Sequence, residues 1–333
     1  MNISSQFSAN NCLMITGGTG SLGKALIKRL LAETPIQRMI VLSRDEQKQF
    51  DFSMELSLEE RERVRFFLGD VRDRERISTA MRNVDFVIHA AAMKIVTTAE
   101  YNPFECIQTN VIGAENIVQA AIEMGVKRVV ALSTDKACNP INLYGASKLA
   151  SDKIFIAGNH LAGARSTRFS VVRYGNVIGS RGSVLPLFRQ LIENNAQSLP
   201  ITDPRMTRFW ITLNQGVEFV LSSLHVMKGG EIFVPKIPSM KVVDLASVLA
   251  PGLPHEIIGI RPGEKLHEMM ISNDDARMTL DLGDRFVIEP FSAEWDRSRK
   301  GLNGKRVSED FEYSSDKNNE WLDAESLEIM IKV

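Results

Sequence analysis

A glycine-rich turn close to the start of the chain constrains the fold more than any other feature. Residues 17–23 read GGTGSLG, and they lie between the apolar run 12–16 and the helical pattern of residues 24–33. Glycines allow a tight turn and a close approach of the backbone to a pyrophosphate, and the following helix offers N–H groups and its positive dipole end. The turn therefore predicts dinucleotide binding. The expected contacts are Gly17, Thr19, Gly20, Ser21, Leu22 and Gly23.

Apolar runs and helical segments go on alternating through the first half of the chain, and this distinguishes the turn from an ordinary strand–turn–helix. Short buried strands with helices between them predict a parallel sheet covered on both faces. We therefore expect an α/β fold with a doubly wound parallel (Rossmann) sheet and a smaller C-terminal substrate lobe. The expected strands are residues 12–18, 38–45, 65–71, 84–92, 127–135 and 169–179, and the expected helices include residues 74–83, 103–125 and 143–161.

Beyond about residue 176 the alternation breaks up, which sets the expected division of the chain. Residues 1–176 and about 208–236 are assigned to the dinucleotide-binding domain, whose sheet EIFVPK would extend by one strand. Residues from about 177 to 207 and from 237 to 333 are assigned to the substrate lobe. The Pro- and Gly-punctuated segment GIRPGEKLHEMM in this lobe is typical of a loop that closes over a cleft.

The end of the second strand distinguishes between two dinucleotides. An NAD enzyme places Asp or Glu about 20 residues beyond the glycines to bind the ribose hydroxyls, whereas this chain has Ser43 and Arg44 there. A guanidinium can pair bidentately with a 2′-phosphate, so the sequence favours NADP, and NAD stays open because Asp45 could turn inward. For Asp70, after the third strand, a turn or helix-capping role is an equal alternative to binding adenine. The expected contacts on this side are Ser43, Arg44, Asp45, Lys48, Asp70 and Val71.

A Tyr-x-x-x-Lys pattern opens the helix expected after the fifth strand. Tyr144 and Lys148 are four residues apart, so they lie on one face of that helix. A nearby ammonium stabilises a tyrosinate, which lets the phenol exchange a proton with a sugar hydroxyl. The same pattern arises by chance on solvated helix surfaces, so the position of this one, after the fifth strand, carries the argument.

Polar side chains that could serve in catalysis also end the fifth strand. Thr134, Asp135 and Lys136 follow one another at the sheet edge where ligands bind in open α/β sheets. A hydroxyl, a carboxyl and an amine could orient a substrate, donate a proton and accept one. A turn cap and a solvated lysine are the alternative to this interpretation. The catalytic candidates are Thr134, Asp135, Lys136, Tyr144 and Lys148.

The overall composition argues against several classes of partner. The 40 basic and 41 acidic residues give a formal net charge of -1, which offers no reason to expect nucleic acid or an anionic membrane. The 3 cysteines are far apart, as expected in a reducing cytoplasm, and no uninterrupted apolar stretch reaches about 18 residues. The 5 histidines lack metal-ligand spacing, so no metal is expected.

Ordered motifs over nearly the whole chain make the sequence recognisable. It resembles the inverting UDP-N-acetylglucosamine 4,6-dehydratases, which begin pseudaminic acid synthesis and belong to the extended short-chain dehydrogenases/reductases. The related 5-retaining enzymes generally carry Met where this chain has Tyr144, and they are often longer, with membrane segments. The motifs include GGTGSLG, SRDEQKQF, HAAAMK, STDKACNPINLYGASKLASDK, RYGNVIGSRGSVLPLF, ITDPRMTRFWI and IIGIRPGEKLHE.

The resemblance implies NADP as the cofactor and UDP-N-acetylglucosamine as the substrate. It adds Ala90 and Lys94 to the cofactor contacts. A diphosphate needs hydrogen-bond donors, and Asn176 and Arg261 match the family best, whereas surface salt bridges are the alternative for Arg181 and Arg208. The expected substrate contacts are Lys94, Asn176, Val177, Arg181, Arg208 and Arg261. The family also suggests a homo-oligomer, with a hexamer as one form.

The resemblance further implies a reaction cycle with a role for each catalytic residue. Tyr144 takes the proton of the 4-hydroxyl while hydride leaves carbon 4 for the nicotinamide. Lys136 removes the hydrogen of carbon 5, for which its amine must be neutral and its pKa depressed. Asp135 protonates the departing 6-hydroxyl, hydride returns to carbon 6, and carbon 5 is reprotonated on the opposite face. A UDP-N-acetylhexosamine 4-epimerase and a catalytically silent NADP-sensing protein are the alternatives.

One loop departs from the family pattern. After Lys94 the family usually reads His-Val-Pro, whereas this chain has Ile95, Val96 and Thr97. Since the loop is expected to border the nicotinamide and the sugar, the missing imidazole is expected to affect the rate or the substrate preference. His89 lies inside the apolar fourth strand and is expected to be a core histidine.

Overall fold

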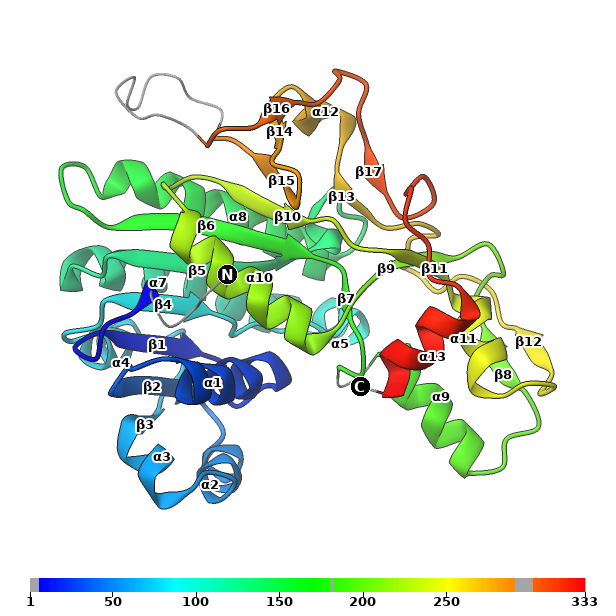
Figure 1. Cartoon of the computed structure of the whole chain (residues 1–333), viewed down its shortest axis with the longest axis horizontal. Helices are drawn as coiled ribbons and strands as arrows, with labels where there is room; N and C mark the ends of the chain where they lie inside the picture. Colours follow the sequence, from blue (N-terminus) through cyan, green and yellow to red (C-terminus); the bar gives the residue numbers. More distant parts are fainter. Residues whose placement is uncertain (1–5, 181–182, 291–301, 333) are drawn as a thin grey trace.

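A 10-stranded sheet forms the centre of the molecule (Figure 1). The computed structural model describes residues 6–180, 183–290 and 302–332. From edge to edge the strands are β3 (Val64–Leu68), β2 (Arg38–Ser43), β1 (Cys12–Thr16), β4 (Phe86–His89), β5 (Arg128–Thr134), β6 (Arg168–Tyr174), β10 (Ile232–Pro235), β15 (Arg285–Ile288), β14 (Thr279–Asp281) and β16 (Lys305–Arg306). The strands from β3 to β10 pair in parallel, in the doubly wound order, so the expected fold class is confirmed.

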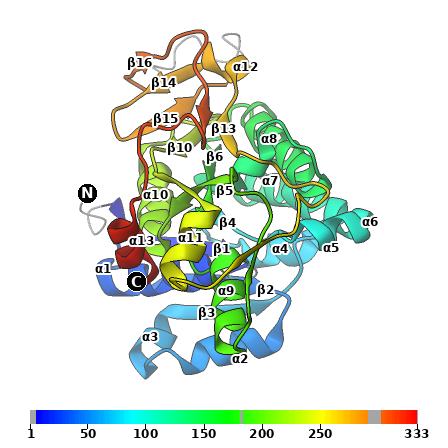
Figure 2. The same cartoon turned by 90° about the vertical axis from the view of Figure 1, so that its right-hand side faces the viewer.

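The side chains of each central strand alternate between two helical layers. In β1, Leu13 and Ile15 pack in one apolar core, whereas Cys12 and Met14 pack in the other, because successive residues of a strand point to opposite faces. The first layer holds α1 (Ser21–Glu33), α2 (Glu46–Met54) and α10 (Leu213–Val226), and the second holds α4 (Arg74–Ala80), α7 (Gly113–Met124) and α8 (Leu143–Leu161). Figure 2 shows the two layers on either side of the sheet.

Two helices show how closely the sequence pattern predicts local structure. The helix expected at residues 143–161 is α8, and the side chain of Asn142 caps its first turn. The helix expected at residues 103–125 is present from Pro103 to Met124 and ends at Gly125, and a π-helical turn lies within it before α7. The elements there are α5 (Val96–Tyr101), α6 (Pro103–Ile107) and the π-helical η2 (Gln108–Ile112), and the remaining short helices of this half are α3 (Leu58–Arg63) and the 3-10 helix η3 (Asp135–Ala137).

A separate apolar core holds the smaller lobe together. Its elements are α9 (Val184–Glu193), α11 (Val242–Leu249), α13 (Ala324–Lys332) and the small sheets of β7 (Asn176–Val177), β9 (Thr207–Ile211) and β11 (Ser239–Lys241) and of β8 (Leu199–Ile201) and β12 (His255–Ile257). Phe188 of α9, Trp210 of β9 and Leu245 of α11 pack in this core. The lobe lies beyond the carboxyl ends of β1 and β6 (Figure 1), where open α/β sheets bind ligands.

Part of the range that the sequence assigned to the substrate lobe returns to the main sheet. Residues 279–288 and 305–306 form β14, β15 and β16, and β15 pairs antiparallel with β10. The other described elements are β13 (Met269–Ile271), which pairs with β17 (Tyr313–Ser314), and α12 (Asn273–Ala276). The division of the chain into a cofactor part and a substrate part stays a prediction.

Candidate active site

The glycine turn has the shape that a pyrophosphate requires. Gly17 has a φ of +65°, and a Cβ atom there would lie 2.8 Å from the backbone nitrogen of Ala91. Gly20 caps helix α1 without a side-chain hydrogen bond. The backbone and the helix dipole are thus the groups that the turn offers to a ligand. The residues of this turn therefore fit a dinucleotide, and their individual contacts with it stay predictions.

At the end of β2 the side chain of Arg44 is accessible, whereas the carboxylate of Asp45 is already hydrogen-bonded. Asp45 caps α2, accepting a hydrogen bond from the backbone N–H of Lys48 at 3.0 Å and pairing with Lys48 Nζ at 2.7 Å. The side chain of Arg44 is 55% exposed, and its Nη1 lies 3.5 Å from Asp70 Oδ2. Gln49 Nε2 donates to the buried Ser43 Oγ. Asp45 is therefore held as a helix cap, which leaves Arg44 as the accessible group for a phosphate.

Asp70 binds the turn that follows β3. Its carboxylate accepts hydrogen bonds from the backbone N–H and from Nε of Arg72, both at 3.0 Å. Burial would raise the pKa of Asp70, but these hydrogen bonds and the charge of Arg44 outweigh it and lower that pKa. The carbonyl of the buried Val71 accepts a hydrogen bond from Asn116. The turn role that was the alternative for Asp70 is present, and contact with adenine stays a prediction.

Thr134, Asp135 and Lys136 form a hydrogen-bonded group at the carboxyl end of β5. Thr134 Oγ1 donates to Asp135 Oδ1 at 2.9 Å, and Lys136 Nζ donates to the same oxygen at 3.0 Å. The Asp135 side chain is only 1% exposed, whereas that of Lys136 is 22% exposed. Burial, with the charge of Glu268 in addition, raises the pKa of Asp135 against the opposing effect of Lys136.

Lys136 is held as an ammonium in this structure. Burial would disfavour its charged form, but the carboxylates of Asp135 and Glu268 outweigh burial and raise its pKa. The depressed pKa that a base in this position would need is therefore absent from the ligand-free protein. Since two anions lie within 3.0 Å of the amine, electrostatic attraction explains the difference.

Helix α8 brings Tyr144 against this group. Gly145 makes the approach possible, since a Cβ atom there would lie only 2.2 Å from the carbonyl oxygen of Lys136. Burial raises the pKa of Tyr144 to about 12, while the charge of Lys136 and a hydrogen bond with Thr134 oppose that rise. Burial also lowers the pKa of the buried Lys148. The charge that favours the tyrosinate most therefore comes from Lys136 in this structure.

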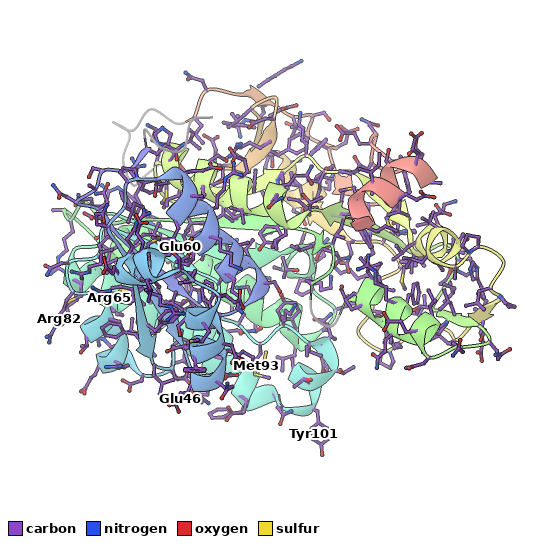
Figure 3. All side chains as sticks on the ribbon, turned by 60° about the horizontal axis from the view of Figure 1, so that its bottom comes forward. Glu46, Glu60, Arg65, Arg82, Met93 and Tyr101 are labelled. Atoms are coloured by element: carbon purple, nitrogen blue, oxygen red, sulfur yellow. The ribbon has the colours of Figure 1, made fainter. Side chains whose placement is uncertain are left out.

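The loop after β4 is fixed to helix α8 through a buried asparagine. Asn110 accepts a hydrogen bond from the backbone N–H of Met93 at 2.8 Å and donates to Ser147 Oγ at 2.9 Å. The hydrogen bond to Met93 fixes the loop that carries Ala90 and the exposed Lys94. Figure 3 shows Tyr101, which is 87% exposed, projecting outward at the end of α5 that follows the loop.

The expected substrate residues occupy different environments. Asn176 and Val177 form β7, beside β9 and close to the end of β6. Arg208, for which a surface salt bridge was the alternative, lies buried in β9, where its guanidinium donates to the carbonyls of residues 207, 265 and 266. Arg261 is exposed and pairs with Glu264 at 2.5 Å. Arg181 lies outside the described residues.

His89 is a core residue, as expected. It is 1% exposed, and its Nδ1 lies 2.8 Å from Thr16 Oγ1. Burial, with a contribution from Lys148, lowers its pKa to about 3. Within the described residues, no group of three or more His, Cys, Asp or Glu side chains is arranged to hold a metal ion, and no helix has the length and apolar character needed to span a membrane.

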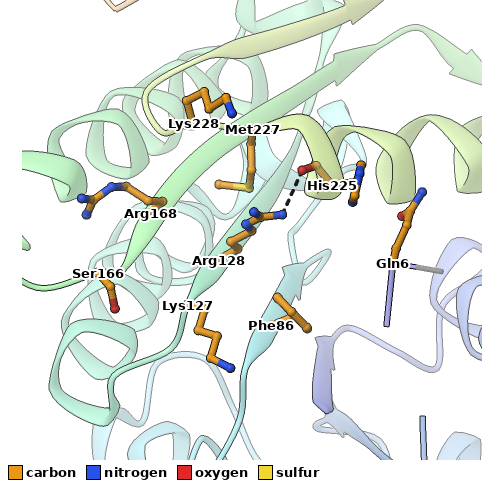
Figure 4. A pocket seen from close by; sticks show the side chains of 9 residues that line it. All are labelled: Gln6, Phe86, Lys127, Arg128, Ser166, Arg168, His225, Met227 and Lys228. Atoms are coloured by element: carbon orange, nitrogen blue, oxygen red, sulfur yellow. Dashed lines mark hydrogen bonds between the residues drawn. The ribbon is translucent and has the colours of Figure 1, made fainter. Parts of the chain in front are cut away.

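A pocket lined by cations lies at the opposite edge of the sheet (Figure 4), near the amino ends of β4, β5 and β6. Its main cations already have structural partners. Arg128 donates to the carbonyls of Leu224 and His225 at the end of α10, and Lys127 pairs with Asp85 at 2.7 Å. Arg128 and Lys127 thus stabilise the end of α10 and the residue before β4.

The chain is similar to several known proteins. A family described as polysaccharide biosynthesis proteins matches residues 13–290. The chain belongs to this family. Among its relatives, the UDP-N-acetylglucosamine 4,6-dehydratase (inverting) of Campylobacter jejuni subsp. jejuni serotype O:2 is 57% identical over 325 residues, 96% of each chain. The expected relationship to the inverting dehydratases is confirmed.

Two further similarities place this member within its family. The solved structure of Pen from Bacillus thuringiensis superposes with a TM-score of 0.88 at 36% identity, covering 97% of both chains. The UDP-glucose 4-epimerase of Rickettsia prowazekii is 44% identical over 283 residues, 83% of this chain and 82% of its own. The dehydratase relative thus covers more of the chain at higher identity than this epimerase.

One residue of the site was not singled out from the sequence. Glu268 is 1% exposed, and its Oε1 lies 3.0 Å from Lys136 Nζ. It ends the motif IIGIRPGEKLHE, far along the chain from the catalytic segment. Only the three-dimensional fold brings the two together, since no local pattern links them. The motif itself was the one signal that could have pointed to this glutamate.

Proposed function

We propose that this polysaccharide biosynthesis protein is a UDP-N-acetylglucosamine 4,6-dehydratase that inverts carbon 5. Its products are water and UDP-2-acetamido-2,6-dideoxy-beta-L-arabino-hex-4-ulose. The observation that carries the proposal is the ion pair between the buried Asp135 and the partly exposed Lys136 next to Tyr144. A 4-epimerase needs a proton-transferring group only for the oxidation of carbon 4, whereas a dehydratase also needs an acid and a base for the elimination of water. Asp135 and Lys136 supply this acid and base. The identity to the Campylobacter dehydratases supports the same function.

The residues of the site divide the proton transfers among them. NADP, held on the glycine turn, supplies the hydride acceptor and donor. Tyr144 accepts the proton of the 4-hydroxyl as carbon 4 is oxidised to a ketone. Lys136, which the structure holds as an ammonium, first passes a proton to the Asp135 carboxylate 3.0 Å away. The neutral amine then removes the hydrogen of carbon 5, which the neighbouring ketone acidifies. Asp135 donates a proton to the departing 6-hydroxyl, and its raised pKa favours the protonated form that an acid needs.

The choice of cofactor and the setting of the enzyme belong to the proposal as well. NADP is favoured over NAD because Arg44 is accessible while Asp45 caps a helix. Asn176 and Arg261 are the donors we assign to the diphosphate of the substrate. We place the enzyme in the cytoplasm as a hydro-lyase at the start of pseudaminic acid synthesis, and as a homo-oligomer, with a hexamer as one form.

Incubation with UDP-N-acetylglucosamine tests the function directly. Mass spectrometry should show a product lighter by one water. Tyr144→Phe should give no product, because the phenol that takes the first proton is gone. Tyr101→Phe makes the same chemical change at a side chain that is 87% exposed and should keep full activity. Equal activity in the two variants would remove Tyr144 from the mechanism.

A second candidate function is 4-epimerisation. It is favoured by the 44% identity to UDP-glucose 4-epimerases, which cover 83% of this chain. An epimerase would return a sugar of unchanged mass. A product of that kind, with no species lighter by one water, would replace the dehydratase by this alternative.

A further inference from the structure

Glu268 is a second carboxylate, besides Asp135, that contacts the candidate base of the reaction. Its Oε1 lies 3.0 Å from Lys136 Nζ, and Asp135 Oδ1 lies 3.0 Å from the same nitrogen. The Glu268 side chain is 2% exposed. The amine is therefore fixed between two carboxylates, one from the end of β5 and one from the segment that precedes β13.

The backbone at Glu268 is fixed at several points. Its N–H donates to Ser315 Oγ at 2.9 Å, and its carbonyl accepts a hydrogen bond from the N–H of Ser315 at 2.8 Å. The loop before it is tied to the catalytic segment, because Lys265 Nζ donates to the carbonyl of Cys138 at 2.5 Å. A carboxylate fixed in this way can orient an amine without having to be ordered during the reaction.

A purely structural role explains only part of this arrangement. Arg208 Nε lies 3.8 Å from Glu268 Oε1, so an ion pair inside the lobe accounts for one partner of that oxygen. Glu268 Oε2 and Asp135 Oδ2 are buried, and neither has a hydrogen-bond partner among the described residues. Most buried polar atoms in proteins have a hydrogen-bond partner. These two oxygens are therefore available to a further hydrogen-bonding group at the site.

The two carboxylates differ in protonation, which divides their roles. Burial raises the pKa of Asp135. For Glu268 burial acts in the same direction, but the charges of Lys136 and Arg208 outweigh it and lower its pKa. Paired acids whose pKa values are pushed apart take separate tasks. Asp135 is thus suited to donate a proton, and Glu268 to remain charged beside Lys136.

We propose that Glu268 is a positioning residue for proton removal from the sugar: it holds the Lys136 amine beside Asp135 and sets the pH at which that amine loses its proton. This inference rests on the function proposed above. The charged and titratable groups that act on Lys136 from the surrounding elements are Asp135 of η3, Glu268, Arg208 of β9 and Tyr144 of α8.

Removal of the charge at Glu268 should leave a distinct pH signature. In Glu268→Gln the ammonium of Lys136 loses one of its two anions, so its pKa should fall. The charge of Glu268 also raises the pKa of Asp135, so that pKa should fall as well. In a plot of kcat against pH, both the acidic and the alkaline limb should therefore move to lower pH. At the optimum, kcat should fall about 10²-fold through misplacement of the amine, while KM stays unchanged.

Direct titration of Lys136 separates this inference from the proposed function. The 13Cε resonance of Lys136, assigned by its loss in Lys136→Arg, should titrate at lower pH in Glu268→Gln than in the wild type. Glu312→Gln, which removes the acid of the exposed Glu312–Lys317 ion pair, is the matched control and should leave it unchanged. In Glu268→Asp, which keeps the charge, the titration should stay near that of the wild type.

Three outcomes decide the matter. An unchanged Lys136 titration in Glu268→Gln overturns the inference, whatever the activity. If the Lys136 titration shifts in Glu268→Gln but the wild-type enzyme releases no water, the contact is supported and the dehydratase function is rejected. Should Glu268→Gln fail to fold, Glu268→Asp carries the test: a reduced kcat with an unchanged KM supports positioning, and full activity overturns it.

Discussion

At the scale of single residues, Arg44 is the side chain that we propose to select NADP over NAD. Its side chain is 55% exposed, and Asp45 beside it caps α2. Arg44→Ala should weaken NADP binding more than NAD binding by about 1.5–3 kcal/mol, the usual range for a charge-assisted hydrogen bond. Titration calorimetry with both cofactors measures the difference. Arg74→Ala removes the cation of the exposed Arg74–Glu123 pair and should leave the ratio unchanged. Equal losses for the two cofactors would contradict the assignment of Arg44.

The sequence predicted the candidate catalytic residues because their chemistry is local. Thr134, Asp135 and Lys136 are consecutive, and Tyr144 opens the next long helix, so strand and helix periodicity alone brings them to one edge. Glu268 could not be found in this way. It reaches Lys136 only through the packing of the loop before β13 on the catalytic segment. The protonation of Lys136 depends on that packing, which is why the sequence could not determine it.

At the scale of elements, the end of α7 offers a clean test of a glycine helix cap. Gly125 has a φ of +71°, and a Cβ atom there would meet nothing within 4 Å. Gly125→Ala should therefore lower the free energy of unfolding by about 1–2 kcal/mol through backbone strain alone. At Gly216, inside α10, a Cβ atom would lie 3.6 Å from Leu22 Cδ1, an ordinary van der Waals contact. Gly216→Ala should therefore be neutral or stabilising. Thermal unfolding compares the two, and a destabilised Gly216→Ala with an unaffected Gly125→Ala would contradict this account.

The helix at residues 103–124 shows what periodicity cannot provide. Its apolar spacing predicts one amphipathic helix, but the π-helical turn at Gln108–Ile112 directs the buried Asn110 toward the loop after β4 and toward Ser147. A single extra residue in a turn changes which side chain faces the site, while the surrounding hydrophobic pattern stays helical. Helix positions were therefore predictable here, and the local geometry that fixes the loop was not.

At the scale of the whole molecule, the parallel core followed from the alternation of short apolar strands and helices. Its extension by β14, β15 and β16 did not, because these short antiparallel strands come from a range without clear alternation. The smaller lobe was expected, and its apolar core includes Phe188, Trp210 and Leu245. The lobe lies beyond the strand ends that carry Asp135 and Lys136 (Figure 1), which leaves the reaction to be tested by its product.

The central claim is that this site eliminates water by removing and returning a proton at carbon 5, and reaction in deuterated water tests it most directly. The account predicts a product lighter than the substrate by the loss of water, carrying one solvent deuterium on carbon 5 with inverted configuration by NMR. Lys136→Ala should fold and bind the cofactor but form this product about 10²–10⁴-fold more slowly, as expected when a positioned general base is lost. A product of unchanged mass without deuterium on carbon 5, formed at the full rate by Lys136→Ala, would contradict the account.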